Sequence, residues 1–161
     1  MEPVHGVSAQ TSTPPYNLIL SKYTYSPGEK ITVTLRNTSA NATIEGFMIQ
    51  ARDASSSTPL GYFEVNNTDV QTLKCTTDAS AVTHKSSTEK TNIQVTWVAP
   101  NATFSNIRLR ATVVQNGERY WKAIVSEKLA YSGSTGYQSL VPGFGQILLY
   151  ITVLSGALCP F

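Results

Sequence analysis

The side chains that most often carry catalysis or bind metals are scarce in this sequence. It contains two histidines, His5 and His84, and two cysteines, Cys75 and Cys159. A Ser–His–Asp triad needs a histidine oriented by a carboxylate, and no Gly-x-Ser-x-Gly motif presents a nucleophilic serine. A closed zinc site needs about four ligands, and no Cys-x-x-Cys or His-x-x-x-His spacing occurs. An open metal site would require the fold to bring His5 and His84 together.

The sequence also lacks a glycine-rich loop that could cradle a phosphate, and it lacks a paired-carboxylate pattern. We therefore expect no catalytic residue, no cofactor and no metal site. His84 stands in the stretch "VTHKSSTEKTNIQVTWVAP", beside one of the two tryptophans, Trp97. We expect His84 to anchor a loop through a hydrogen bond and Trp97 to lie in the core.

The composition favours strands and argues against nucleic acid as a partner. Charged residues make up 14% of the 161 residues, and the formal net charge is +2. That charge is too small to attract nucleic acid by bulk electrostatics. Serine, threonine and asparagine take the place of charge, and threonine and valine fit the half-buried surface of a sheet.

Alternating apolar and polar residues predict several short strands separated by turns, and no segment has the 3.6-residue period of a helix. "KITVTLR", for example, places Ile31, Val33 and Leu35 on one face of a strand. The predicted fold class is all-β, an antiparallel β-sandwich. Strands are expected at residues 16–22, 30–36, 44–52, 60–65, 70–76, 92–98, 107–115 and 119–126, with a polar loop at 77–91.

A hairpin is predicted around the dipeptide "NG" at residues 116–117. A two-residue turn would put Lys122 on the apolar face. A three-residue loop ending in a left-handed Gly117 puts Trp121, Ala123 and Val125 there, and we prefer that register because it keeps the face apolar.

In the preferred register, Arg108, Arg110 and Lys122 share the outer face of the hairpin, with Arg110 opposite Lys122. Like charges directly across a ladder are mildly destabilising, and a bound sulfate or carboxylate would relieve the repulsion. These three residues are therefore a candidate face for an anionic ligand such as a glycosaminoglycan. The alternative is a solvated basic face that pairs with nearby glutamates.

Asn-x-Ser/Thr sequons and the uncharged C-terminus bear on localisation. The four sequons begin at Asn37, Asn41, Asn66 and Asn101, in polar, turn-like segments, and indicate a secreted or cell-surface glycoprotein. No apolar leader follows Met1. No charged residue follows Lys128, and residues 147–161 are largely apolar. The tail 130–161 has the layout of a lipid-anchor signal, and a shortened membrane segment or an alternative terminus are the other interpretations.

The sequence resembles the reeler (reelin N-terminal) domain family over residues 1–129. The resemblance lies in the ordered blocks "EPVHG", "PPYNL", "YSPGEKITVTL", "GFMIQAR", "GYFEV", "LKC", "VTHKSSTEK", "VTWVAP" and "RYWKAIVSEKL". It implies an immunoglobulin-like sandwich. Within the family, these sequence blocks are most similar to the N-terminal domain of ferric-chelate reductase 1-like proteins.

The resemblance also implies a partner for Cys75, since the family pattern carries a cysteine shortly before the block that here begins at Met1. In ferric-chelate reductase-like proteins, iron is reduced through a membrane cytochrome module whose haem is held by histidines on several helices. This chain has no histidine after His84, so it is not expected to carry that reaction alone.

The function predicted from these observations is a non-catalytic extracellular recognition module, the ectodomain of a ferric-chelate reductase-like membrane protein. Its expected partners are a glycosaminoglycan, a microbial surface or a protein, with membrane attachment through the tail. The alternatives are a fragment of a ferric reductase and a secreted defence protein that binds microbial or glycan surfaces.

Overall fold

Residues 6–133, the part of the chain that this computed structural model describes, form eleven strands and no helix. It therefore has no helix that is long and apolar enough to cross a membrane. The strands are β1 (Tyr16–Leu20), β2 (Thr24–Tyr25), β3 (Lys30–Asn37), β4 (Gly46–Asp53), β5 (Tyr62–Glu64), β6 (Val70–Leu73), β7 (Ala81–His84), β8 (Asn92–Val98), β9 (Ile107–Asn116), β10 (Arg119–Val125) and β11 (Ala130–Tyr131).

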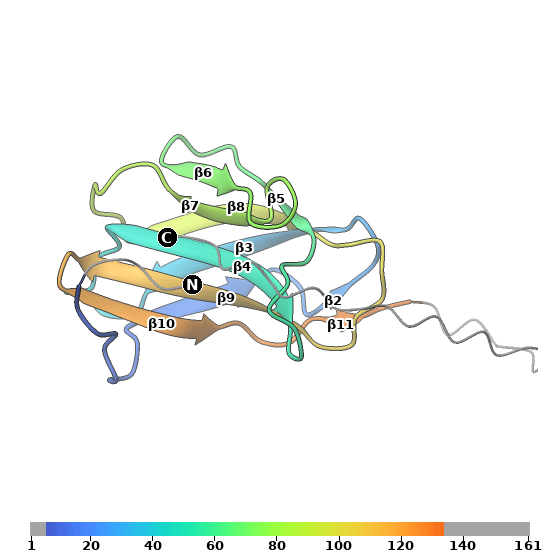
Figure 1. The fold of residues 1–161 in the computed structure, drawn as a ribbon, viewed down its shortest axis with the longest axis horizontal. Coiled ribbons are helices and arrows are strands. Elements are labelled where there is room, and N and C mark those ends of the chain that lie inside the picture. The colour runs from blue at the N-terminus through green and yellow to red at the C-terminus, as the bar shows by residue number, and fades with distance from the viewer. Residues whose placement is uncertain (1–5, 134–161) are drawn as a thin grey trace, which may run out of the picture.

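Two antiparallel sheets form the layers of a sandwich (Figure 1). One sheet has four strands in the order β1-β3-β8-β5, and the other has five in the order β10-β9-β4-β7-β6. A third, two-stranded sheet joins β11 to β2 in parallel, just beyond residue 129. The predicted all-β sandwich is confirmed.

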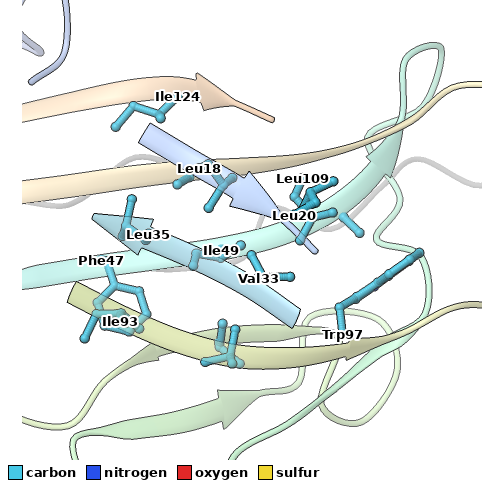
Figure 2. Close-up of a cluster of buried hydrophobic side chains, with 14 of the residues drawn as sticks. Leu18, Leu20, Val33, Leu35, Phe47, Ile49, Ile93, Trp97, Leu109 and Ile124 are labelled. Carbon is cyan, nitrogen blue, oxygen red and sulfur yellow. The ribbon is translucent and has the colours of Figure 1, made fainter. Parts of the chain in front are cut away.

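The core lies between the two large sheets and is built from every second residue of their strands. Figure 2 shows these side chains converging from both layers. On β3, the predicted inward residues Ile31, Val33 and Leu35 are fully buried. Burying each such side chain stabilises the fold by about 1.5–3 kcal/mol. Trp97 is also fully buried, as expected, and its indole Nε1 donates a hydrogen bond to the Leu60 carbonyl at 2.9 Å.

One strand lies where a polar loop is predicted. β7 occupies residues 81–84 of the expected loop 77–91 and pairs with both β4 and β6. The strand has four residues between polar segments, and its first three residues are buried. A strand this short has too few residues to show alternation in the sequence. Sheet pairing on both sides stabilises it instead.

Candidate functional site

The β9–β10 hairpin differs from the predicted register. Asn116 pairs with Arg119, so the turn has two residues, Gly117 and Glu118, and Gly117 is not among the described residues with positive φ. A three-residue loop with a left-handed Gly117 is therefore wrong. Register shifts occur between Arg119 and Tyr120 and between Trp121 and Ile124.

The second shift is a bulge that changes which side chains of β10 face inward. Trp121 pairs with Val113 and is buried, as predicted. Ala123 then adopts φ 60°, and Ile124 rather than Ala123 pairs with Ala111. The extra residue buries an isoleucine in place of an alanine, which removes more apolar surface from water. Ala123 and Val125, both predicted to face inward, are exposed.

The bulge also changes the cross-strand pairing of the predicted basic residues. Val125, not Lys122, lies opposite Arg110, so the predicted Arg110–Lys122 pair is wrong. Arg108 and Arg110 do share one face of β9, but their cross-strand neighbours on the other side come from β4. There Arg52 pairs with Arg108, and Gln50 pairs with Arg110.

The resulting arginine cluster, defined as Arg52, Arg108 and Arg110, lies on the outer face of the five-stranded sheet. All three residues are partly exposed, whereas Gln50 between them is fully buried. Arg52 was missed by the sequence reasoning, because the adjacency of β4 and β9 depends on a pairing between strands more than fifty residues apart.

A chain of hydrogen bonds orients part of the cluster. Arg52 donates from Nε to the Gln50 side-chain oxygen at 3.0 Å, and from Nη2 to the same atom. Gln50 in turn donates from Nε2 to Cys75 Sγ at 2.9 Å. Arg108 Nη1 donates to the Ser126 carbonyl at 3.0 Å. These contacts orient Arg52 and Arg108 through neutral acceptors, and no ion pair within residues 6–133 compensates their positive charge.

Arg110 differs from its two neighbours, because its Nε atom is buried and has no hydrogen-bond partner within residues 6–133. A buried donor without an acceptor costs about 1–3 kcal/mol. In the same part of the chain, the ion pairs are Lys22–Glu29, Lys30–Glu64 and Lys74–Asp78, and none includes a cluster arginine. Burial, and then the charge of Arg110, lower the pKa of Arg52.

This arrangement suits an oxyanion ligand. Guanidinium groups present several N–H donors in a planar fork that matches carboxylate, sulfate or phosphate oxygens. An oxyanion at the cluster would reduce the repulsion between Arg110 and Arg52. The cluster consists of arginines alone and contains no nucleophile or general base.

Comparison with known proteins shows which family this chain belongs to. The model of the Reeler domain family matches residues 1–136. The chain belongs to the reeler family. A putative ferric-chelate reductase 1 of Danio rerio is 38% identical over 136 residues, which cover 83% of this chain and 24% of that protein. A putative defense protein of Bombyx mori is 30% identical over 131 residues, which cover 78% of this chain and 75% of that protein.

The crystal structure of the human F-spondin reeler domain has the same fold, with a TM-score of 0.64 at 22% identity, covering 78% of this chain and 94% of that one. The matched part of this chain spans about a quarter of the length of the ferric-chelate reductase and three quarters of the length of the defense protein. The suspected reeler membership is confirmed.

His84 has a structural environment in this reeler domain. It is the last residue of β7, and its Nδ1 accepts a hydrogen bond from the Phe47 backbone N–H at 3.2 Å. Its ring packs 6.1 Å from the Phe47 ring, and a Cβ built on Gly46 would lie 3.0 Å from its Cε1. The expected anchoring hydrogen bond is present, although it joins β7 to β4 and not to a loop. Residues 6–133 hold no group of three His, Cys, Asp or Glu side chains suited to a metal, and His5 lies outside them.

Cys75 follows β6 in the chain. The backbone N–H of Cys75 donates a hydrogen bond to Ser80 Oγ at 3.0 Å. Cys159 and the tail from residue 134 lie outside the described residues. The pairing of Cys75 with a cysteine upstream of Met1 and the interpretations of the tail stay predictions.

The four sequons do not lie in equivalent surroundings. Asn41, Asn66 and Asn101 are exposed. Asn37, at the end of β3, is half-buried, and its Nδ2 donates to the Ser39 carbonyl at 3.2 Å and to the Ala42 carbonyl at 2.6 Å. None of the four belongs to β4 or β9, the strands that carry the arginine cluster.

Proposed function

We propose that this chain is a non-catalytic extracellular reeler module whose arginine cluster binds anionic groups, with the sulfates of a glycosaminoglycan as the ligand class. The observation that carries the proposal is the grouping of Arg52, Arg108 and Arg110 across the β4–β9 ladder, with no carboxylate ion-pair partner within residues 6–133. The predicted face of Arg108, Arg110 and Lys122 is thus revised, with Arg52 in place of Lys122.

The extracellular setting rests on the exposed sequons at Asn41, Asn66 and Asn101. None of these three sequons belongs to β4 or β9, the strands that carry the cluster. Membership of a ferric-chelate reductase-like membrane protein rests on the 38% identity to the fish protein over its reeler portion. We place the chain there as an ectodomain module, and iron reduction belongs to other parts of such a protein.

The ligand proposal is tested by calorimetric titration of the full chain with a heparin-derived octasaccharide. The double substitution Arg52→Met and Arg110→Met is expected to weaken binding by about two orders of magnitude, because each charge-assisted hydrogen bond is worth about 1.5–3 kcal/mol. Arg36→Met is the matched control, because Arg36 is an exposed arginine on the opposite sheet. Equal losses in both variants would show bulk charge attraction and refute the site.

Two further measurements separate the alternatives. Binding of hyaluronan, which carries carboxylates and no sulfates, equal to that of heparin would refute sulfate selectivity. A haem Soret band in the purified chain would refute the non-catalytic assignment, because the chain would then hold a redox cofactor. Selective binding to bacterial cells that survives loss of both arginines would favour the defence-protein alternative.

A further inference from the structure

β1 is an edge strand of the four-stranded sheet, whereas the arginine cluster lies on the five-stranded sheet. Among the strands of residues 6–133, β1 pairs with β3 alone and on one side. At the two ends of this pairing, the Ser21 N–H donates to the Thr32 carbonyl at 3.0 Å, and the Thr38 N–H donates to the Pro15 carbonyl at 2.9 Å. Both bonds join directly opposed residues, so the odd-numbered residues of this segment bond toward β3.

It follows that the even-numbered residues of β1 direct their backbone groups away from β3. Tyr16, Leu18 and Leu20 bury their side chains in the core, while their N–H and C=O groups face the open edge. Such a row of donors and acceptors is a template for another strand.

Four strands lie at the edges of the two large sheets, namely β1, β5, β6 and β10. β10 and β5 have protective features that β1 lacks, and β6, with the sequence VQTL, is shorter than β1. β10 carries the bulge at Lys122–Ala123, and both residues are exposed. β5 has only three residues and ends in Glu64. β1, with the sequence YNLIL, contains no charge, no proline and no bulge. Natural sheets normally blunt an exposed edge with one of these devices.

A groove runs beside this edge, between β1 and the end of β10. It has a volume of about 250 Å³ and is lined by the whole of β1 together with Tyr23, Ile124, Val125 and Glu127. Tyr23 and Val125 are 54% and 40% exposed, two of the four large apolar side chains that are exposed within residues 6–133. The groove thus combines backbone groups that have no strand partner within residues 6–133, an apolar wall and one carboxylate.

We propose that the β1 edge binds an extended segment of a partner protein, which adds to the four-stranded sheet as a further strand. The backbone of the segment would bond to Tyr16, Leu18 and Leu20, as in other cases of strand addition. Apolar side chains at alternate positions would contact Ile124 and Val125, and a basic residue would meet Glu127. A second copy of β1 is a poorer match, because YNLIL supplies no cation for Glu127.

Panning a 12-residue peptide library on phage against the immobilised full chain tests the proposal. Enriched peptides should alternate apolar and polar residues and include a lysine or arginine. Bound to the chain as a synthetic peptide, the best sequence should slow amide hydrogen exchange of Tyr16, Leu18 and Leu20 at least about tenfold. Failure to enrich any peptide, or protection at another edge, would overturn the proposal.

Asn17→Lys is the diagnostic variant, because it places a charge on the exposed face of the edge strand and repels a basic peptide. It should weaken the affinity of the chain for the peptide by about tenfold or more. Thr34→Lys is the control, since Thr34 lies on the same face one strand further in, beside Ile19, and its effect should stay within about twofold. Equal effects would overturn the edge assignment. Concentration-dependent self-association that protects the same three amides would assign the edge to a second copy and overturn the partner proposal.

Discussion

Substituting Arg110 by methionine should stabilise the domain and abolish much of its anion binding. Methionine retains most of the length of the side chain and removes the guanidinium. The substitution therefore eliminates a buried Nε that has no acceptor and also the repulsion that acts on Arg52. Unsatisfied buried donors cost about 1–3 kcal/mol. Part of this cost is offset by lost contacts, so we expect a gain of about 1 kcal/mol, or about 2–4 °C in Tm for a chain of this size.

The binding effect of Arg110→Met has the opposite sign. One charge-assisted hydrogen bond is worth about 1.5–3 kcal/mol, which corresponds to an affinity loss of roughly tenfold to 150-fold. Thermal unfolding by circular dichroism, with and without a heparin-derived octasaccharide, measures both quantities in one series. The ligand should raise the Tm of the natural chain and leave that of the variant nearly unchanged. A lower Tm for the ligand-free variant would refute the reasoning, because Arg110 would then already have a favourable partner.

Three other variants or conditions test the fold and the surface. Gly61→Ala should destabilise the domain by about 3 kcal/mol or more in chemical denaturation. Gly61 has φ +65°, and a Cβ there would lie 2.2 Å from the Val98 carbonyl oxygen. A loss of stability below about 1 kcal/mol would contradict this geometry. Burial raises the pKa of Tyr16 to about 12, so its contribution to stability is fully present below pH 10 and is lost as the pH rises from 10 towards 12; Tyr16→Phe should flatten this part of the stability profile, and an unchanged slope would be inconsistent with the burial of the phenol. On secretion from mammalian cells, peptide mass spectrometry should find high glycan occupancy at the exposed Asn66 and the lowest occupancy at Asn37, whose amide is engaged within the fold; the reverse order would contradict this surface.

The fold follows from the sequence wherever a strand is long enough to alternate. Asn92–Val98 is predicted and observed with the same bounds, because Ile93, Val95 and Trp97 recur with a period of two. β7 is different, since its four residues carry no periodic signal and its burial comes from pairing on both sides. The two-residue strands β2 and β11 were missed for the same reason.

The candidate site was only partly predictable. The alternation of β9 placed Arg108 and Arg110 together on the outer face, which the structure shows. The bulge at Ala123 could not be foreseen from the sequence. A strand without a bulge places Trp121, Ala123 and Val125 on one face, and that face is also apolar. Arg52 joins the cluster through the pairing of β4 with β9, and such long-range pairings are not encoded in local periodicity.

The most direct test of the anion-binding assignment is a nuclear magnetic resonance titration of the isotope-labelled full chain with a heparin-derived octasaccharide. Arginine Nε–H resonances report each guanidinium separately. The account predicts that the Nε–H resonances of Arg52 and Arg110 shift at substoichiometric ligand, that Arg36 does not respond, and that the shifts weaken as salt is added. Shifts confined to residues outside β4 and β9, or equal shifts at Arg36 and Arg110, would contradict it.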